Sequence, residues 1–387
     1  MRDAVICAAV RTPVGKRGGG LSGVHAVDLS AHVLEALAER SGLDPAVVED
    51  VLWGCVSQVG EQTFNIGRNA ALAAGWPESV PGTTIDRQCG SSQQAVAFAA
   101  ATVVSGQADV VVAGGVESMS RVPMGSTTRG DGTVGLPLGP RFLARYDGVF
   151  PNQGVGAEMI AERWGFSRTQ LDEFSLASHE KAAKAQADGA FEEEIAPVTT
   201  AEGTVVSADE GVRPGGTLEK LASLKTPFKE DGVISAGNAS QISDGAAALL
   251  VTTSEKAREL GLTPLVRIHT TVVAADDPVI MLTAPIPATQ KALRRSGLST
   301  DDIGIFEVNE AFAPVPMAWL ADIGADESRL NPQGGAIALG HPLGGSGARI
   351  MTTLIHRMRA TGTRYGLQTM CEGGGMANAT ILELIDA

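Results

Sequence analysis

Short apolar runs and longer helical stretches follow one another in the first third of the chain. Apolar or β-branched runs predict strands at 4–10, 83–86 and 108–113, the last of them closed by two glycines. Helical stretches at 26–40 and 91–105 are each followed closely by a glycine, which suits the C-cap of a helix. Strands that alternate with helices predict a layered α/β fold with a mixed or parallel sheet.

The middle of the chain, from about 118 to 243, breaks this rhythm. It is rich in Gly, Pro, Thr and charged residues, and it contains one clear helical stretch, at 169–187. From about residue 265 the alternation of strands and helices returns. We therefore expect the middle segment to be an excursion built on a core and not a continuation of that core.

Three features of the first third recur near the end of the chain at an almost constant offset. The pairs are 51–55 with 305–309, the turn Cys89-Gly-Ser-Ser with Leu343-Gly-Gly-Ser, and 110–114 with 367–371. Such a repeat indicates two similar α/β halves that flank one insertion. Equivalent turns of the two halves can then face one another and build a shared site.

Composition and charge indicate a globular protein and exclude or disfavour several other classes. A length of 387 residues is typical of two or three domains, and 44% hydrophobic with 19% charged residues excludes disordered, collagen-like and coiled-coil chains. The net charge of −14 disfavours general binding to nucleic acid or to an anionic membrane, because both would repel the chain. No apolar run approaches the roughly 20 residues that a bilayer requires. We interpret the apolar N-terminal run as a first strand and not as a signal peptide.

Cysteine usage indicates a reducing environment. Four cysteines are too few for a disulfide framework in a chain of this length, and neither CxxC nor HExxH spacing occurs. We therefore expect a cytoplasmic protein with no metal site. Cys7 and Cys55 lie in or at the end of predicted strands, where we expect them to be packing residues.

Cys89 lies in a tight turn between a predicted strand and the predicted helix at 91–105. The free N–H groups and positive partial charge of a helix N-terminus favour a thiolate, so we expect the pKa of this thiol to lie below its reference of about 8.5. The helix is apolar nearly all round, which predicts burial on all faces and a thiol at the base of a pocket. A nucleophile and a small structural cysteine are both compatible with this position.

His341 lies between Gly340 and Pro342, inside a glycine-rich turn that precedes another predicted helix. An imidazole held in such a turn can take a proton from a thiol or donate a hydrogen bond to a developing oxyanion. A histidine that only satisfies the turn is the alternative interpretation.

Two further strand ends carry reactive or polar side chains. Cys371 ends an apolar strand and is followed shortly by three glycines, which let backbone N–H groups approach an anion. Asn309 and Glu310 end another strand, where open α/β sheets place ligand sites. A core cysteine and a helix N-cap are the respective alternatives.

These residues belong to long, ordered segments that resemble the thiolase family from end to end. The segments are VRTPVGKRGG, RQCGSSQQA, AGGVESMS, AGNASQISDGAA, NEAF, GGAIALGHPLGGSGAR and TMCEGGGMA. The resemblance implies a thiolase fold: two similar βαβαβαββ halves in a layered α-β-α-β-α arrangement with an inserted loop domain. It implies an N-terminal half at 1–117, completed by about 244–264, a loop domain at 118–243, and a C-terminal half at 265–387.

The resemblance also implies roles for individual residues. Cys89 matches the nucleophile that becomes acylated, and His341 matches the residue that activates this thiol and lines an oxyanion hole. Cys371 matches the second cysteine, which shuttles a proton. Asn309 matches the residue that holds a water in the first oxyanion hole, and the backbone N–H groups of Cys89 and Gly373 match the second hole.

Coenzyme A is the implied co-substrate, with no permanently bound cofactor. Ser240 matches a contact to its pantetheine arm, and nucleotide contacts are expected from the stretch 213–229, with Arg213, Lys220 and Lys225 as cations. The implied partners are acyl-CoA and CoA, with no nucleic acid and no membrane. The implied assembly is a homodimer or homotetramer.

The resemblance is nearer to degradative thiolases, which cleave 3-oxoacyl-CoA to acetyl-CoA (or propionyl-CoA) and a shortened acyl-CoA in fatty acid, sterol or related lipid breakdown. Biosynthetic condensation of two acetyl-CoA is the alternative. Glu372 and Gln94 depart from the small or apolar residues of familiar acetoacetyl-CoA-forming members. Cys371 argues against a decarboxylating ketoacyl synthase and has no purpose in a Cys-His-Asn hydrolase. The intact set of Cys89, His341 and Cys371 argues against a non-catalytic lipid-binding relative.

Overall fold

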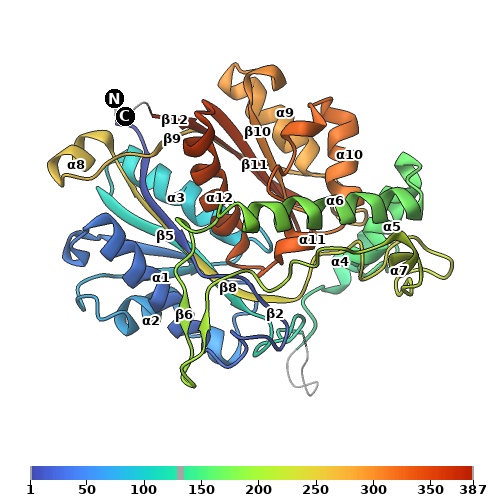
Figure 1. Ribbon diagram of the computed structural model, residues 1–387, viewed down its shortest axis with the longest axis horizontal. Coiled ribbons are helices and arrows are strands. Elements are labelled where there is room, and N and C mark those ends of the chain that lie inside the picture. The colour runs from blue at the N-terminus through green and yellow to red at the C-terminus, as the bar shows by residue number, and fades with distance from the viewer. Residues whose placement is uncertain (1, 129–134, 386–387) are drawn as a thin grey trace.

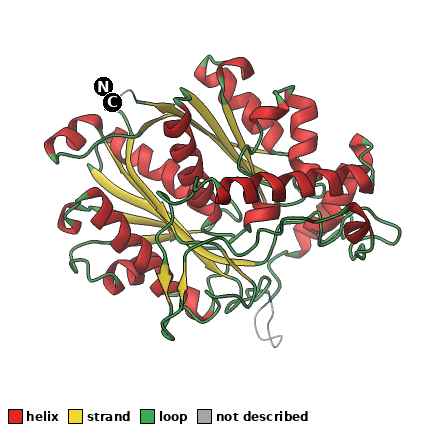
Figure 2. Ribbon diagram, viewed as in Figure 1, coloured by secondary structure: helices red, strands yellow, loops and turns green. Residues whose placement is uncertain are grey.

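A mixed sheet of ten strands runs through the part of the chain that the computed structural model describes, residues 2–128 and 135–385 (Figures 1 and 2). Its strands follow the order β10-β11-β12-β9-β1-β8-β5-β3-β4, with β2 paired to β8 off this path. Their bounds are β1 Val5–Arg11, β2 Gly15–Lys16, β3 Asp50–Gly54, β4 Gly82–Ile85, β5 Val110–Ser118, β8 Ser243–Thr252, β9 Val266–Ala275, β10 Ile305–Val308, β11 Tyr365–Glu372 and β12 Met376–Leu384.

The sheet consists of two groups of strands with the same topology. In the first group β3 lies parallel to β5, β5 antiparallel to β8, and β8 antiparallel to β1. In the second group β10, β11, β12 and β9 repeat these relations in the same order. The groups join where β1 pairs with β9. The segments that repeat in the sequence therefore occupy equivalent strands, β3 with β10 and β5 with β11.

The long helices cover the sheet on both sides and also fill the space between the two groups of strands (Figure 1). In the middle, α3 packs on α12, and α12 contacts strands of both groups. One core cluster accordingly mixes residues of both halves, such as Leu249, Ala95, Met351 and Leu382. Helices α1 and α2 cover the first group from outside, and α9 and α10 cover the second. The layers thus follow the order α-β-α-β-α.

The remaining helices are short or belong to the middle segment. The helix bounds are α1 Ala26–Ser41, α2 Ile66–Ala73, α3 Ser91–Ser105, α4 Pro140–Arg145, α5 Gln153–Trp164, α6 Arg168–Ala187, α7 Leu218–Ala222, α8 Ser254–Glu259, α9 Pro285–Ser296, α10 Pro314–Ile323, α11 Ala336–Leu339 and α12 Ser346–Thr361. Short 3₁₀ helices lie at Pro45–Val47, Gly60–Gln62, Thr300–Asp302 and Glu327–Arg329. None of the helices described is long and apolar enough to cross a membrane.

The described parts of 118–243 consist of helices α4 to α7, a small hairpin and long connections. The hairpin pairs β6 (Val198–Thr199) with β7 (Val205–Val206) in a sheet of its own. Helix α6 confirms the helix expected at 169–187, whereas α5 was not expected. The sequence prediction missed α5 because two glycines interrupt it, and glycine is unfavourable inside a helix.

Two local expectations are wrong. Strand β5 does not end at its two glycines but runs through them to Ser118. Neither position has room for a side chain, because one at Gly114 would collide with Trp53 and one at Gly115 with the Gly344 carbonyl. Close packing, and not a turn, therefore explains these glycines. Helix α3 is not buried on all faces, since Phe98 is 44% exposed. Its first turn, which follows Cys89 and Gly90, is nevertheless buried.

Candidate active site

A cavity of about 590 Å³ lies over the start of helix α3. Cys89 lines it together with Gly373, which follows β11, and Leu343, which precedes α12. The remaining wall is largely apolar and comes mostly from the middle segment. It includes Met124, Leu138, Phe142, Phe150, Pro151, Pro278, Met281 and Met376. Segments from both halves and from the excursion therefore meet at one cavity.

The turn that carries Cys89 is fixed by its own hydrogen bonds. Gln88 adopts a left-handed conformation with φ of 48°, which turns the chain sharply from β4 into α3. The Ser91 hydroxyl donates to the Gln88 carbonyl at 2.5 Å and accepts from the Arg87 N–H at 2.9 Å. The Cys89 side chain is thereby held at a helix N-terminus, where only 3% of the residue is exposed.

The thiol of Cys89 does not have the lowered pKa that its position at a helix N-terminus predicts. Burial raises its pKa, and the neighbouring Cys371 and Glu372 raise it further, while a hydrogen bond from Gln153 lowers it only in part. Removal of water from the thiolate therefore outweighs the helix terminus. Cys89 is therefore a neutral thiol near neutral pH, and a nucleophilic attack by its sulfur would need a base.

Cys371 lies at the end of β11 and is fully buried. The Asn309 side-chain amide donates to its Sγ at 3.8 Å, and the Asn309 backbone N–H donates to the Thr369 carbonyl at 3.1 Å. Burial raises the pKa of Cys371 to about 12, with the Asn309 hydrogen bond opposing the rise. Cys371 therefore keeps its proton near neutral pH and can donate it. The Asn309 Oδ1 atom is buried and has no hydrogen-bond partner among the residues described.

His341 has one ring nitrogen engaged and one free. Its Nδ1 lies 2.6 Å from the Ser346 hydroxyl, and that hydroxyl donates to the Pro342 carbonyl at 2.8 Å. Because the serine proton is used on the carbonyl, Nδ1 carries the imidazole proton and Nε2 presents a lone pair. Nε2 is buried without a partner in the described chain. Burial and the Arg349 charge lower the His341 pKa to about 3, so the ring is neutral, and it stays a weak base until a negative charge develops beside it.

Buried contacts bring the His341 turn to the Cys89 turn. The Ala348 N–H of α12 donates to the Ser92 hydroxyl of α3 at 2.9 Å, and Leu343 belongs to the same apolar cluster as Cys89. The Glu117 carboxylate accepts hydrogen bonds from the Gly344 N–H and from the backbone of the loop after β3. The equivalent turns of the two halves thus meet, which the repeat in the sequence predicts.

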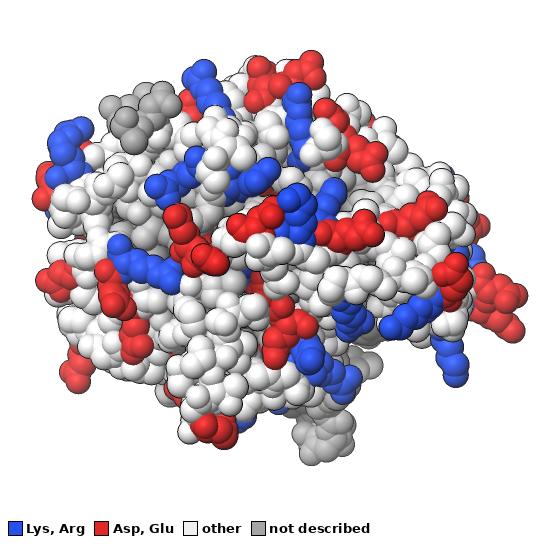
Figure 3. Space-filling view, viewed as in Figure 1, with Lys and Arg blue, Asp and Glu red and all other residues white. Residues whose placement is uncertain are grey.

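The residues expected to bind coenzyme A lie apart from this cavity. Arg213 and Lys220 line a smaller cavity of about 150 Å³, whose other walls include Leu176, Leu221 and Leu224. Ser240 is not among the residues that line either cavity, and its backbone N–H donates to the Ala311 carbonyl at 2.9 Å. The next residue, Gln241, lines the smaller cavity and donates to the Ile337 carbonyl at 2.8 Å. The face seen in Figure 3 interleaves Lys and Arg with Asp and Glu.

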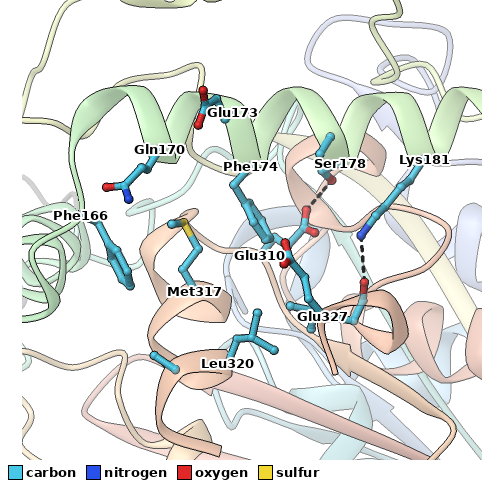
Figure 4. A pocket seen from close by; sticks show the side chains of 13 residues that line it. Phe166, Gln170, Glu173, Phe174, Ser178, Lys181, Glu310, Met317, Leu320 and Glu327 are labelled. Carbon is cyan, nitrogen blue, oxygen red and sulfur yellow. Dashed lines mark hydrogen bonds between the residues drawn. The ribbon is translucent and has the colours of Figure 1, made fainter. Parts of the chain in front are cut away.

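Glu310, the neighbour of Asn309, belongs to a different cavity. This cavity, of about 550 Å³, lies between α6 and α10 (Figure 4). The Glu310 carboxylate accepts from the Ser178 hydroxyl at 2.7 Å and from the Asn331 amide at 2.8 Å. Glu310 therefore ties the middle segment to the C-terminal half, and Asn309 alone of this pair contacts a thiol, that of Cys371.

Three residues in and around the candidate site were not expected from the sequence. Ser346 is hydrogen-bonded to His341 and Gln153 to Cys89, whereas Glu117 holds the Gly344 backbone in the turn after His341. Ser346 had a recognisable signal, since it starts the helix five residues after His341, whereas Gln153 lies in a segment expected to be a loop. No group of three or more His, Cys, Asp or Glu side chains in the described ranges could hold a metal ion.

Comparisons with known proteins agree with this architecture. Residues 4–255 match the thiolase N-terminal domain and residues 262–384 match the thiolase C-terminal domain. The steroid 3-ketoacyl-CoA thiolase FadA6 of Mycobacterium tuberculosis is 51% identical, over 99% of this chain and 94% of its own. A β-ketoadipyl-CoA thiolase of Escherichia coli is 44% identical over the whole of both chains. The crystal structure of an acetyl-CoA acetyltransferase of Bacillus anthracis superposes with a TM-score of 0.91 at 39% identity, over 100% of this chain and 99% of that one.

The chain belongs to the thiolase family. It is an acyltransferase, and the relatives named as 3-ketoacyl-CoA and β-ketoadipyl-CoA thiolases support a degradative function on CoA-linked substrates.

Proposed function

We propose that Cys89 carries the acyl group between two molecules of coenzyme A. In the first step the Cys89 sulfur attacks C3 of a 3-oxoacyl-CoA while His341 Nε2 takes the thiol proton. The C2–C3 bond then breaks with its electron pair on C2, and Cys371 donates its proton there. Acetyl-CoA (or propionyl-CoA) leaves, and the shortened acyl group remains on Cys89 as a thioester.

In the second step a free CoA thiol gives its proton to Cys371, and its sulfur attacks the acyl carbon. Cys89 leaves as a thiolate, recovers its proton from His341, and a shortened acyl-CoA departs. Water held by Asn309 and the backbone N–H groups of Cys89 and Gly373 stabilise the negative oxygens of both steps. The proposed protons and charges balance without a resident metal or redox cofactor.

One observation carries this proposal. Two buried thiols, one from each half of the repeat, lie close enough for the charge of Cys371 to raise the pKa of Cys89. A neutral imidazole with a free Nε2 is held on the turn that packs against Cys89. A hydrolase would need a nucleophile and a base but would have no use for the second thiol.

The acyl group that best suits the cavity is apolar and larger than acetyl. Its wall contains Leu138, Phe142, Phe150 and Met281, and Asp86 is the only charged side chain among its described lining residues. A terminal carboxylate on the acyl chain, as in β-ketoadipyl-CoA, would find no cation in that described lining. The steroid-acting relative from Mycobacterium tuberculosis supports a bulky apolar group.

For coenzyme A itself we propose that Arg213 and Lys220 bind the phosphates of the nucleotide and that Ser240 contacts the pantetheine arm. The two cations share a cavity with apolar side chains, which suits a charged and partly apolar ligand. We also propose the division into halves at 1–117 with 244–264 and at 265–387, around a loop domain at 118–243.

We further propose a cytoplasmic homodimer or homotetramer. Strand β4 ends the ten-stranded sheet, and Phe64, which precedes the neighbouring helix α2, is 85% exposed. A free sheet edge beside an exposed aromatic ring favours association with a second chain. Light scattering should give a mass of two or four chains, and a stable monomer would contradict the assembly.

A thiolysis assay tests the function directly. Purified protein is given CoA with 3-oxoacyl-CoA substrates of short, long, ring-bearing and carboxylate-ended acyl groups, and the acetyl-CoA formed is measured. We expect ping-pong kinetics, the highest kcat/KM for bulky apolar groups, and loss of activity in Cys89→Ala. Absence of turnover with all four classes, or an active Cys89→Ala variant, would contradict the proposal.

A further inference from the structure

The residue after Cys371 is a carboxylic acid buried beside the nucleophile. Glu372 has no measurable exposure, and neither of its carboxyl oxygens has a hydrogen-bond partner among the residues described. Successive side chains of a strand point to opposite faces, so Glu372 points away from the side of β11 that carries Cys371. An unpartnered buried carboxyl group is costly, and it therefore requires an explanation.

Glu372 lies directly under the turn that carries Cys89. A side chain placed at Gly90 would lie 2.0 Å from the Glu372 Oε1 atom and 2.8 Å from the Asn378 amide nitrogen. That amide already donates to the Gly90 carbonyl at 3.0 Å. The missing side chain of Gly90 thus leaves the space that the carboxyl group fills, one residue from the nucleophile.

The charged and titratable groups around Glu372 come from the same turn. Arg87 and Asp86 act on its charge from the segment between β4 and α3, and the charge of Glu372 in turn acts on Cys89 and on its own strand neighbour Cys371. No ion pair joins Arg87 to Glu372 in the part of the chain described. Asn378 on the paired strand β12 contributes a neutral amide.

These surroundings favour the protonated carboxyl group. Burial raises the pKa of Glu372 to about 8, and the Arg87 charge together with the nearby Asn378 backbone N–H offsets this rise only in part. In the opposite direction, the charge of Glu372 raises the pKa of Cys89. The two groups therefore oppose each other's ionisation.

We propose that Glu372 sets the alkaline limit of the reaction: it is neutral in the working enzyme and inhibitory once ionised. This inference rests on the proposed function of Cys89. A carboxylate at this point would oppose the negative charge that develops on the Cys89 sulfur. It would equally oppose the oxyanion at the backbone N–H of Gly373, its neighbour in the chain. Thiolysis then fails at a pH at which both thiols and His341 still hold their working protonation states.

The test compares pH profiles of kcat/KM for acylation in wild type, Glu372→Gln and Glu307→Gln. Glu307 is the matched control, because burial also raises its pKa to about 8 but its charge does not act on Cys89. A group with a pKa of about 8 is more than nine-tenths ionised at pH 9.5, so we expect wild type and Glu307→Gln to lose at least tenfold between pH 7 and 9.5. Glu372→Gln should keep its activity over this range. Ionisation of the substrate affects the three proteins equally, so it cancels when kcat/KM of each variant is divided by the wild-type value at the same pH.

Two outcomes overturn the inference. One is that kcat/KM of Glu372→Gln falls at alkaline pH as it does in wild type, and the other is that kcat/KM of Glu307→Gln does not fall. Should the glutamine variant not fold, Glu372→Met gives the same comparison, since it also lacks the charge. Alkylation of Cys89 with iodoacetamide, followed by peptide mass spectrometry, provides a second readout without substrate. Failure of the proposed function would look different, because wild type would then show no acylation at any pH.

Discussion

The hydroxyl of Ser346 offers a sharp test of how His341 works. Replacement by Ala removes the acceptor of the Nδ1 proton, which lies 2.6 Å away, and leaves a buried N–H group without a partner. The loss of a buried partner costs about 1–3 kcal/mol. It also releases the ring to adopt the other tautomer, in which Nε2 carries the proton and cannot act as a base.

If the ring must hold the correct tautomer in the transition state, the free energy lost with the Ser346 hydroxyl also raises the activation free energy of thiolysis. We expect kcat/KM for thiolysis to fall by roughly five- to 140-fold, since about 1.4 kcal/mol corresponds to a factor of ten. KM for CoA should change little. The assay is steady-state thiolysis at neutral pH with a saturating partner substrate.

Ser30 provides the matched control for this substitution. It is equally buried, its hydroxyl donates to the Ala26 carbonyl four residues back at 2.8 Å, and it accepts from the Trp53 ring N–H at 3.1 Å. Ser30→Ala should therefore cost a similar free energy of unfolding while its kcat/KM stays at the wild-type value. Equal kcat/KM values in Ser346→Ala and wild type would refute the assignment of the tautomer.

Three further predictions concern ligand binding and stability. Charge reversal at Arg213 or Lys220 should raise KM for CoA about tenfold with kcat nearly unchanged, and an unchanged KM at both positions would place the nucleotide elsewhere. The folded-state pKa of Glu372, about 8, lies above its usual 4.5, so wild type should lose stability as pH rises through this window. Thermal unfolding should then show Glu372→Gln gaining over wild type up to pH 8–9, and a constant difference across pH would contradict this. The His341 pKa of about 3 lies below its usual 6.5, so its contribution, at most about 5 kcal/mol, is complete above pH 6.5 and lost as pH falls toward 3. His341→Asn should flatten this acid limb in chemical denaturation, and an unaltered acid limb would argue against a buried neutral ring.

Much of the fold could be predicted from local pattern. Helix α3 has the predicted bounds because an apolar run is followed by Gly106, which caps it with φ of 76°. The repeat in the sequence predicted that the turns before α3 and α12 meet, and Ala348 and Ser92 make that contact. Helix α5 was missed because its stability comes from packing against the rest of the molecule and not from its own sequence.

The properties that depend on burial could not be predicted in this way. The sequence places Cys89 at a helix N-terminus, which lowers a thiol pKa, but the balance with desolvation depends on what surrounds the thiol in space. The separation of Asn309 from Glu310 likewise depends on which face of the chain meets α6. The position of Glu372 under Gly90 follows only from the packing of the end of β11 against the turn that carries Cys89.

The central claim is that two buried thiols and one imidazole, beside the cavity that Cys89 lines, divide an acyl transfer into two steps. The most direct measurement is the mass of the intact protein after incubation with a 3-oxoacyl-CoA in the absence of free CoA. The account predicts a mass increase equal to the shortened acyl group, located on the peptide that contains Cys89 and discharged by added CoA. An unmodified protein that still forms acetyl-CoA, or an acyl group that resides on any other residue, would contradict it.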